Sequence, residues 1–490
     1  MDTIASQRDL GALFAPRAVA VVGASATGDS VANRFLRNLR RLSFEGEVYV
    51  IHPKAAEVEG FRTYPSLAEM PGEVDYAYIA VAAERTPGLF AGAANKVRFA
   101  QVVSSGFAEV GRHDLQDELL EACGAAGVRL LGPNCIGTHS SGGRISFHAQ
   151  PTTLKSGPVG IISQSGGLST DILTRGRMRG VGFHSVISVG NSADLGPVEL
   201  LEHMLADPAI RVVGLYLEDI VRGRAFFDVL RRAGAAKPVV ILKGGRTAAG
   251  QRASMSHTGA LMADDRIWQA LARQTGAVLV ESLDRFVNAL LVFQTVAPRT
   301  DRATRRVSLF GNGGGTSVLA ADAFSRVGLD VPALSQAAND ALEALKLPPG
   351  TSIANPIDAP GTTLKLDSGR IGVEILKGIM LDRDIDLIVT HINMSVMLGY
   401  QDREIVPNFV NGAAALRHQE SNAPHLALVL RSGGEPEVEE GRNALREHLL
   451  GLGIPVFDEL EDAALAFSAL AVHESFLRRS QAGHEHLDAA

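Results

Sequence analysis

The residue of this chain with the clearest capacity for covalent chemistry is His257. It stands in the stretch 254–261, Ser-Met-Ser-His-Thr-Gly-Ala-Leu, ahead of a helix expected from about Asp264. Small neighbours allow a phosphorylated substrate to approach the imidazole closely, and imidazole is both a nucleophile and an acid–base group. A histidine in such a stretch also occurs as a solvated or hydrogen-bonded loop residue. We interpret His257 as a candidate carrier of a phosphoryl group on a loop that moves between two sites.

Two carboxylates, Glu218 and Asp219, follow the apolar run 212–217 directly. A nucleophilic histidine needs an acceptor for its second ring N–H, so that the attacking nitrogen keeps its lone pair. Glu218 is the candidate acceptor, and it would also stabilise a phosphorylated imidazole through a hydrogen bond. The alternative is a pair of acids at the end of a strand that simply face solvent.

The elements that must position these residues repeat a strand–turn–helix plan. In the part of the chain that contains His257, strands are expected at 158–162, 185–189, 212–217, 238–242 and 277–280. The first of these runs into Ser163-Gln164-Ser165-Gly166-Gly167 and a helix. Backbone N–H groups at a helix N-terminus bind anions, so Ser165, Gly166 and Gly167 are candidate phosphate-binding residues.

The plan is repeated after residue 300. Strands are expected at 307–310, 425–430 and 454–457, and the first leads into a Gly-Asn-Gly-Gly-Gly-Thr turn at 311–316. This pattern predicts an internal duplication of one flavodoxin-like parallel sheet. The second copy has no equivalent of the His257 stretch. An insertion that one copy does without is hard to attribute to folding, which favours a functional role for His257.

The N-terminal part predicts a separate nucleotide-binding sheet. An apolar strand at 17–22 feeds the turn Gly23-Ala24-Ser25-Ala26-Thr27-Gly28 and a helix to about residue 42. This is a phosphate cradle, but Ser25 stands where the dinucleotide fingerprint has its second glycine. After the next strand, 47–51, the charged residue is Lys54 rather than the acid of an NAD site. A cation at this position suits the phosphorylated ribose of NADP or of coenzyme A. The alternative is that Lys54 is a surface lysine at the end of a strand.

Further strands at 75–81, 99–103 and 128–131 complete this sheet, and the loops after them meet at the same sheet edge. They place Ala82, Ser105, Asn134 and Cys135 near the phosphate cradle. Cys135 is interpreted as a small packed residue rather than a covalent one.

Composition limits the class of protein. The chain has 490 residues, 46% hydrophobic residues, 51 glycines and 5% aromatics, which indicates an α/β protein of about three domains. The net charge of −7 has mixed signs throughout and argues against a nucleic-acid-binding surface. There are two cysteines, the start carries no basic-then-apolar signal, and no apolar run is long enough to span a bilayer. We therefore expect a cytoplasmic protein without membrane association.

Taken together, the motifs resemble the α-subunit portion of the nucleoside-diphosphate-forming (ADP-forming) acyl-CoA synthetases, in the succinyl-CoA synthetase superfamily. The order of the motifs and their coverage of nearly the whole chain carry this resemblance. The motifs are Gly23-Ala24-Ser25, Pro53-Lys54, Tyr64-Pro65-Ser66-Leu67, Ser105-Gly106-Phe107-Ala108-Glu109, Gly132-Pro133-Asn134-Cys135, Ser163-Gln164-Ser165-Gly166, Val189-Gly190-Asn191, Tyr216-Leu217-Glu218, Lys243-Gly244-Gly245-Arg246, Ser256-His257-Thr258-Gly259-Ala260 and Asn355-Pro356-Ile357-Asp358.

The resemblance implies a fold and a set of roles. It implies a Rossmann-like CoA-binding domain at 1–145 and two flavodoxin-like ligase domains at 151–300 and 301–490. His257 would be the phosphorylated histidine and Glu218 its orienting acid, with Ser165, Gly166 and Gly167 holding phosphate beside the thioester. The implied CoA-binding residues are Gly23, Ala24, Ser25, Gly28, Lys54, Ala82, Ser105, Asn134 and Cys135. No metal site is implied in this chain.

The same resemblance implies a reaction and a partner. Acid, CoA and ATP would interconvert with acyl-CoA, ADP and phosphate through an acyl phosphate and phosphohistidine. The family also needs an ATP-grasp region, and nothing after Phe457 supplies one, since only a helical run from Glu459 to about Arg479 and a polar tail remain. ATP or ADP with Mg²⁺ is therefore expected on a separate ATP-grasp β subunit, in a heterotetramer. The substrate acid, a small carboxylic acid, is not identified.

Two other classes of protein remain as alternatives. An NADP-linked dehydrogenase would account for the first sheet and Lys54, but not for the duplicated sheets or the His257 stretch. A non-catalytic CoA-binding sensor or scaffold would account for the missing nucleotide domain, but it would have little reason to keep both Glu218 and His257.

Overall fold

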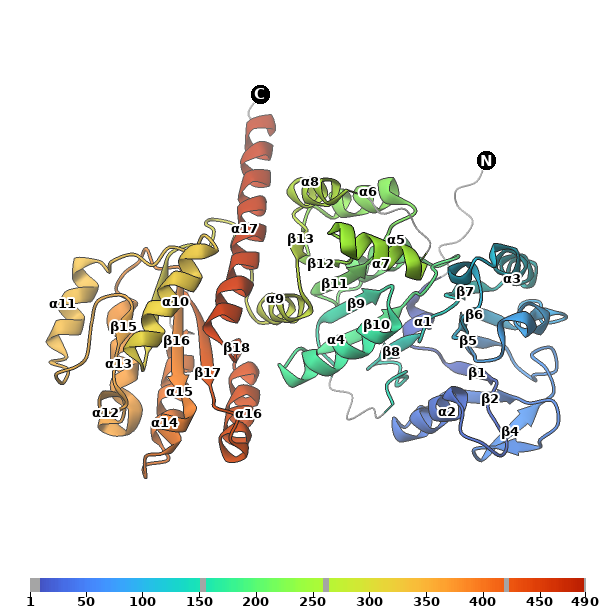
Figure 1. Cartoon of the computed structure of the whole chain (residues 1–490), viewed down its shortest axis with the longest axis horizontal. Helices are drawn as coiled ribbons and strands as arrows, with labels where there is room; N and C mark the ends of the chain where they lie inside the picture. The colour runs from blue at the N-terminus through green and yellow to red at the C-terminus, as the bar shows by residue number, and fades with distance from the viewer. Residues whose placement is uncertain (1–8, 150–155, 259–263, 418–422, 489–490) are drawn as a thin grey trace. The chain divides into compact units, whose positions relative to one another are not determined.

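The computed structural model describes residues 9–149, 156–258, 264–417 and 423–488, which form three sheets flanked by helices (Figure 1). The chain divides into two compact units. Residues 1–177 and 181–281 form the first unit, and residues 178–180 and 282–490 form the second. The first unit contains two of the sheets and the second contains the third. The α/β architecture predicted from the sequence is confirmed, while the exact limits of the three predicted domains stay a prediction.

The first sheet has the strand order β3-β4-β2-β1-β5-β6-β7, with β1 between β2 and β5. All pairs are parallel except β3 with β4. Every residue of β1 is buried, as expected for a central strand covered on both faces. Its strands are β1 (Ala18–Val22), β2 (Glu47–Ile51), β3 (Glu57–Val58), β4 (Phe61–Tyr64), β5 (Val74–Ile79), β6 (Val97–Val102) and β7 (Arg129–Leu131). Its helices are α1 (Gly11–Phe14), α2 (Val31–Arg41), η1 (Ala83–Arg85), η2 (Pro87–Phe90), η3 (Ala108–Val110) and α3 (His113–Ala126).

The second sheet has the order β13-β12-β11-β9-β10-β8. Its five parallel strands follow the flavodoxin-like order, and β8 adds an antiparallel edge through its pairing with β10. The strands are β8 (Thr138–Ser140), β9 (Val159–Ser163), β10 (Phe183–Ser188), β11 (Val212–Leu217), β12 (Val239–Lys243) and β13 (Val278–Val280). The helices are α4 (Gly166–Met178), α5 (Pro197–Ala206), α6 (Gly223–Ala233), α7 (Ala248–Thr258) and α8 (Asp265–Thr275).

The third sheet, in the second unit, has the order β15-β14-β16-β17-β18, all parallel. This is the same flavodoxin-like order, in agreement with the predicted duplication. The strands are β14 (Val307–Gly311), β15 (Ile357–Asp358), β16 (Leu387–Asn393), β17 (His425–Arg431) and β18 (Val456–Phe457). The helices are α9 (Leu283–Thr295), α10 (Gly314–Arg326), α11 (Gln336–Ala344), α12 (Gly361–Leu364), η4 (Leu366–Gly369), α13 (Arg370–Ile379), α14 (Met394–Leu398), α15 (Ile405–Arg417), α16 (Pro436–Gly451) and α17 (Leu460–Asp488).

Several elements were not part of the sequence-based expectation, among them the strands β3, β4, β8, β15 and β16. The central strand β16 was not predicted, because Thr390 and His391 interrupt its apolar run, yet both side chains are buried between neighbouring strands. Strand β8 is a short edge strand that only its pairing with β10 defines. The last helix, α17, continues to Asp488, beyond the predicted end near Arg479.

The two sheets of the first unit share one hydrophobic core. Phe35 of the helix α2 and Ile187 of the strand β10 belong to the same cluster of buried residues. Arg129 of β7 makes a two-pronged ion pair with Asp194, with N–O distances of 2.9 to 3.1 Å. These contacts hold the edge of the first sheet against the loop after β10.

The described residues include neither a helix suited to span a membrane nor a side-chain cluster suited to hold a metal ion. None of the helices there combines the length and the apolar character needed to cross a bilayer. The same residues contain no group of three or more histidine, cysteine, aspartate or glutamate side chains arranged to hold a metal ion.

A buried carboxylate stabilises the second unit, and its removal has a predictable cost. Glu474 of α17 is fully buried and accepts hydrogen bonds from the amides of Arg299, at 2.9 Å, and Thr304, at 2.6 Å. Glu474→Ala leaves two buried amides without their acceptor, so we expect a loss of about 2 kcal/mol in the free energy of unfolding of this unit. Thermal unfolding followed by calorimetry measures it. Glu461→Ala, at an exposed position of the same helix, is the control and should change the midpoint little.

Candidate active site

The carboxyl ends of β9 and β11 lie side by side in the second sheet. The two strands pair in parallel although β10 comes between them in the sequence. Ligands of such sheets bind at this reversal of strand order. The turn 163–165 follows β9, and residues 218–219 follow β11. The structure therefore brings the predicted phosphate-binding turn next to the predicted catalytic carboxylate.

Gln164 fastens these two loops together. Its side-chain oxygen accepts hydrogen bonds from the amides of Glu218 and of Asp219, the latter at 3.1 Å. Its side-chain nitrogen donates to the carbonyl of Asp219 at 2.8 Å, and its backbone amide donates to the carbonyl of Tyr216 at 3.1 Å. The backbone that carries Glu218 is thus fixed against the turn after β9.

The Glu218 side chain is held as firmly as its backbone. Its side chain is buried, and the hydroxyl of Tyr216 donates to its Oε1 at 3.0 Å. Burial, and then the adjacent carboxylate, raise the pKa of Tyr216, so this hydroxyl stays protonated and remains a donor. At Gly244, a Cβ would lie 2.8 Å from the Tyr216 hydroxyl and 3.4 Å from Cγ of Glu218. A larger residue at position 244 would displace this pair.

Lys243, the last residue of β12, adds a cation beside these carboxylates. It is almost fully buried, and its Nζ donates to the carbonyl of Gly244 and lies 5.6 Å from the centre of the Trp268 ring. Burial lowers the pKa of Lys243, and the nearby Asp219 and Glu218 oppose this shift. The lysine therefore balances negative charge at a buried edge of the sheet.

His257 stands in the last turn of α7, which ends at Thr258. A loop was predicted for this stretch, and for residues 254–258 the backbone is helical instead. The run 253–258 contains no glycine or proline that would end a helix earlier. The side chain of His257, like the whole of residues 259–263, lies outside the described part of the chain. The helix that carries it lies beside η3.

Ser165, Gly166 and Gly167 form the start of α4, as the sequence predicted. The Ser165 hydroxyl accepts a hydrogen bond from the amide of Leu168 at 3.3 Å, as an N-terminal cap does. A Cβ on Gly166 would lie 2.8 Å from Cγ2 of Ile136, whereas a Cβ on Gly167 would meet no atom within 4 Å. The first turn of the helix is therefore packed on one side and open on the other, where its amides can meet an anion.

The turn after β1 needs its first glycine. Gly23 has a φ of 99°, and a Cβ there would lie 2.2 Å from the carbonyl oxygen of Ala80. In the rest of the turn, more backbone amides are hydrogen-bonded to neighbouring side chains than the sequence predicted. The Ser25 amide donates to Oδ1 of Asn33 at 2.8 Å, and the Gly28 amide donates to the Ser25 hydroxyl at 2.8 Å. The backbone amides of Ser25 and Gly28 therefore make hydrogen bonds that shape the turn itself. The sequence had predicted that the amides of this turn bind the phosphates of a ligand.

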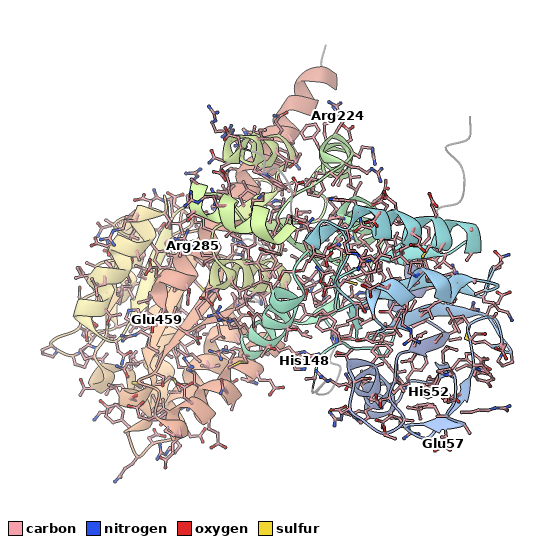
Figure 2. The ribbon with its side chains drawn as sticks, turned by 45° about the vertical axis from the view of Figure 1, so that its right-hand side comes forward. His52, Glu57, His148, Arg224, Arg285 and Glu459 are labelled. Carbon is pink, nitrogen blue, oxygen red and sulfur yellow. The ribbon has the colours of Figure 1, made fainter. Side chains whose placement is uncertain are left out.

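The other predicted CoA-binding residues of this sheet differ in exposure. Lys54, Ala82 and Ser105 are exposed, in loops after β2, β5 and β6, while Ala24 is buried. His52, labelled in Figure 2, accepts the amide of Lys54 at 3.2 Å and orders that loop. The strands β2, β1, β5 and β6 are neighbours, so these loops share one edge. An exposed cation and a glycine turn on one edge fit a ligand with phosphate groups, such as CoA.

Asn134 and Cys135 follow β7. Asn134 has a φ of 56°, and its Nδ2 donates to Oδ1 of Asn191 at 3.3 Å. The Cys135 thiol is buried and lies 3.6 Å from the carbonyl oxygens of Val102 and Leu131. Burial raises the pKa of the Cys135 thiol, so it stays protonated and unreactive. This agrees with a packing role for Cys135, without contact of its side chain with a ligand.

Asn191 connects the edges of the first and second sheets. Its Nδ2 donates to Oε2 of Glu109 at 2.6 Å and to Oε1 of Gln116 at 3.1 Å. Glu109 also accepts from the amides of Gly106 and Phe107. Burial by itself would raise the pKa of Glu109, but these hydrogen bonds outweigh it and lower the pKa. The loop beside Ser105 is therefore tied to the loop after β10.

Five residues of these edges carried no individual role in the expectations from sequence: Gln164, Tyr216, Lys243, Asn191 and Glu109. Each stands inside a motif that carries the family resemblance, and all but Glu109, which lies in η3, stand at or close to the end of a strand. Their position within these motifs was the signal in the sequence that could have identified them as site residues. The hydrogen bond of Gln164 to Asp219 spans 55 residues of chain and that of Asn191 to Glu109 spans 82, so the sequence did not reveal them, whereas Tyr216 and Lys243 bond to residues one or two positions away in the sequence.

Comparisons with known proteins agree with this geometry. A family model of a CoA binding domain matches residues 17–141, and a model of a succinyl-CoA ligase like flavodoxin domain matches residues 156–293. The α subunit of the ADP-forming acetate–CoA ligase I of Pyrococcus furiosus is 31% identical over 475 residues, covering 94% of this chain and 97% of that protein.

Two further relatives extend the comparison. The ADP-forming acetate–CoA ligase I of Archaeoglobus fulgidus is 32% identical over 464 residues, which cover 94% of this chain but 63% of that longer protein. The solved structure of the dinucleotide forming acetyl-coenzyme A synthetase 1 of Ca. Korarchaeum cryptofilum, in complex with phosphate and ADP, superimposes with a TM-score of 0.82. The two are 30% identical, and the match covers 96% of this chain and 99% of that chain.

Proposed function

We propose, from the premise that this chain belongs to the family of α subunits of ADP-forming acyl-CoA ligases, that it performs the acyl-transfer half of that reaction with His257 as the phosphoryl carrier. The observation that carries the proposal is the fixed Glu218 carboxylate at the carboxyl edge of the second sheet. In sequence it precedes α7, the helix on which His257 stands.

Three displacements make up the proposed reaction. Inorganic phosphate attacks the thioester carbonyl of an acyl-CoA, the carbon–sulfur bond breaks, and acyl phosphate and CoA thiol result. An imidazole nitrogen of His257 then attacks the phosphorus atom, and the free carboxylate leaves. Finally a terminal oxygen of ADP attacks the phosphohistidine, which gives ATP and restores the imidazole. Read in reverse, the steps use ATP and an acid to make the thioester.

Glu218 has the properties that the imidazole requires. It accepts the N–H of the ring nitrogen that does not react, which keeps the lone pair on the other nitrogen. The Tyr216 hydroxyl and the Gln164 side chain hold the carboxylate and its backbone before the imidazole arrives. Little reorganisation is then needed when charge develops on the ring.

The start of α4 is the proposed phosphate site. Ser165, Gly166 and Gly167 place the first amides of the helix on an open side, next to the strand β11, which Glu218 follows. These amides stabilise negative charge on the acyl phosphate without selecting the acid, because backbone donors are the same for any acyl group.

CoA is proposed to bind along the edge of the first sheet. Gly23 lets the backbone come close to the CoA phosphates, and the exposed Lys54 faces the phosphorylated ribose. Ala82, Ser105 and Asn134 line the remainder of the edge. The hydrogen bonds of Asn191 to Asn134 and Glu109 couple this edge to the second sheet, and we propose that they direct the thioester end toward α4.

The nucleotide is proposed to bind on a partner chain. A relative that is named an α subunit matches along 97% of its length, whereas a longer ligase matches along 63%. We therefore propose an ATP-grasp β subunit that holds ATP or ADP with Mg²⁺, in a heterotetramer in the cytoplasm. The relatives named acetate–CoA ligases suggest a small carboxylic acid as the substrate.

The test uses the full chain and acetyl phosphate, because the proposed second step needs no nucleotide domain. After incubation at alkaline pH, which preserves phosphohistidine, we expect one added phosphate by mass spectrometry. Tandem spectra should locate it on His257, and His257→Ala should remain unlabelled. The genomic-neighbour ATP-grasp protein with ATP and Mg²⁺ should give the same label. If the chain binds CoA and neither phosphoryl donor labels it, the ligase proposal is wrong and a CoA sensor or scaffold takes its place.

A further inference from the structure

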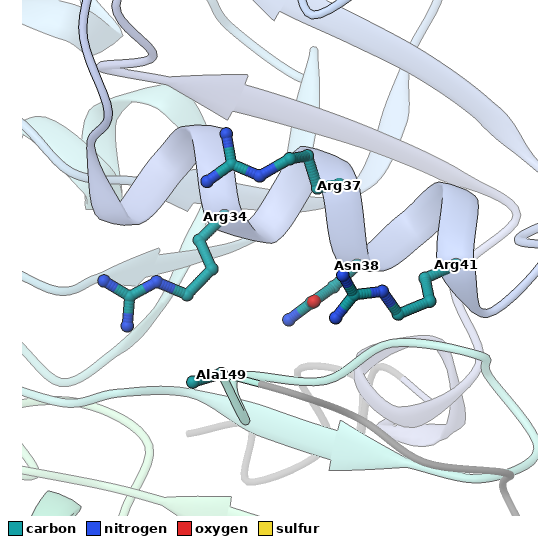
Figure 3. Close-up of a pocket in the computed structure, with 5 residues that line it drawn as sticks. All are labelled: Arg34, Arg37, Asn38, Arg41 and Ala149. Atoms are coloured by element: carbon teal, nitrogen blue, oxygen red, sulfur yellow. The ribbon is translucent and has the colours of Figure 1, made fainter.

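One face of α2 presents three arginines to a cavity that the reaction does not use. Arg34, Arg37 and Arg41 are spaced three and four residues apart, so they share one side of the helix. With Asn38 and Ala149 they line a cavity of about 230 Å³ (Figure 3). In this view the side chains of Arg34 and Arg41 extend toward Ala149, with Asn38 between them.

The wall opposite the helix is held in place by Asn38. This side chain is buried, and its Nδ2 donates to the carbonyls of Ser146, at 3.0 Å, and His148, at 2.8 Å. His148, labelled in Figure 2, contacts the Thr174 hydroxyl through Nε2 at 3.3 Å. The cavity thus lies between α2 and the segment 146–149, and Asn38 joins the two.

Positive charge in this cavity is only partly neutralised. Arg37 is paired with Asp29 and with Glu59, at 2.7 Å from the latter. Neither Arg34 nor Arg41 has a carboxylate within 4 Å among the described residues, and both are exposed. Two guanidinium groups without a carboxylate within 4 Å among the described residues, in a chain of net charge −7, indicate a site for an anion.

We propose that this cavity binds a free, multiply charged phosphate anion, such as inorganic phosphate or pyrophosphate, at a site separate from the predicted CoA and catalytic residues. Planar guanidinium groups donate two parallel hydrogen bonds to phosphate oxygens, which suits several arginines around one anion. Arg34 and Arg41 are roughly 10 Å apart along the helix axis, and in our proposal their long side chains move together around an anion that binds between them. The apolar anchors that a protein partner would need are missing from the lining residues.

The bound anion would join α2 to the segment that ends at Ala149. Because Asn38 already joins the same two segments, occupancy would stabilise an arrangement that exists without the ligand. The inference rests on the cavity and its charges, and it holds whether or not His257 carries phosphate.

The test is calorimetric titration of the full chain with inorganic pyrophosphate at low ionic strength, first without CoA and then with saturating CoA. We expect the double variant Arg34→Gln/Arg41→Gln to weaken pyrophosphate binding at least about tenfold, because each change removes a charge-assisted contact. Arg40→Gln is the matched control. It removes an arginine of the same helix whose guanidinium lies over the Phe61 ring, and it should change the affinity less than twofold. Arg37 is left intact because its ion pairs support the fold.

Each other outcome overturns the inference. Pyrophosphate affinity that is equal in the wild type and the double variant would mean that any bound anion sits elsewhere, for example at the start of α4. An absence of binding at millimolar pyrophosphate would leave the cavity without a ligand of this class. Displacement of pyrophosphate by CoA would make the cavity part of the CoA site. Equal thermal midpoints of the three ligand-free proteins establish that the variants fold, and labelling of His257 by acetyl phosphate should be unchanged in all of them.

Discussion

Replacement of His257 by asparagine is expected to lower the rate of acyl-CoA formation by the complete enzyme at least about a thousandfold. Asparagine is close to histidine in size and keeps a hydrogen-bond donor, but it has no ring nitrogen to attack phosphorus. Without a covalent intermediate, the phosphoryl group would have to pass directly between acyl phosphate and nucleotide. Steady-state consumption of CoA with ATP, the acid and the β subunit measures the loss.

Binding and folding controls separate this effect from structural damage. CoA binds on the first sheet in our proposal, so titration calorimetry should give the same CoA affinity for His257→Asn and the wild type. His448→Asn is the matched control, because His448 is exposed on α16 of the other unit, where its Nε2 contacts Oδ1 of Asn411 at 2.7 Å. A His257→Asn enzyme that keeps more than a tenth of the turnover would exclude phosphohistidine as an obligatory intermediate.

Glu218→Gln is expected to slow phosphorylation of His257 about a hundredfold. The variant keeps the size of the side chain and an oxygen that can accept from the Tyr216 hydroxyl, so the local fold should persist. It removes the negative charge that stabilises a positive imidazole in the transition state. A charge-assisted hydrogen bond contributes roughly 1.5–3 kcal/mol, and about 2.7 kcal/mol corresponds to a hundredfold change in rate.

Rapid-quench measurement of the label transferred from acetyl phosphate gives this rate directly. Asp219→Asn is the matched control, because it removes the same charge one residue away, where Gln164 contacts the backbone only. Its rate should fall less than fivefold. Equal losses in the two variants would mean that Glu218 acts through the general charge of the sheet edge and does not orient the histidine.

The hydrogen bonds of Asn191 have a consequence for how the two sheets of the first unit cooperate. CoA and phosphate are proposed to bind on different sheets, so their reacting atoms meet only if the two edges keep a fixed relation. Asn191 contacts Glu109 and Asn134 of the first sheet, and Arg129 is paired with Asp194 nearby. The two sheets also share a hydrophobic core, which brings them together without fixing how their edges are aligned. The polar contacts provide that alignment.

The amino-acid sequence by itself determined the strand–turn–helix units and the residues at their ends. Buried parallel strands are continuous apolar runs, so β1 and β11 were located within one or two residues. The duplication was likewise visible, because both copies repeat the same order of strand and glycine turn. Parallel strands end at one edge, and this rule grouped the loops that carry Ser105 and Asn134 with the glycine turn of the first sheet.

Only the tertiary structure decided which polar side chains act together at those edges. Gln164 binds residues 218 and 219, and Asn38 binds residues 146 and 148, through contacts that span more than 50 residues of chain. The spacing of Arg34 and Arg41 in the sequence is enough to place both on one face of a helix. The cavity, however, exists because a segment distant in the sequence packs opposite that face. Local sequence encodes the period and burial of each element, whereas the partner of a polar group depends on how the elements pack.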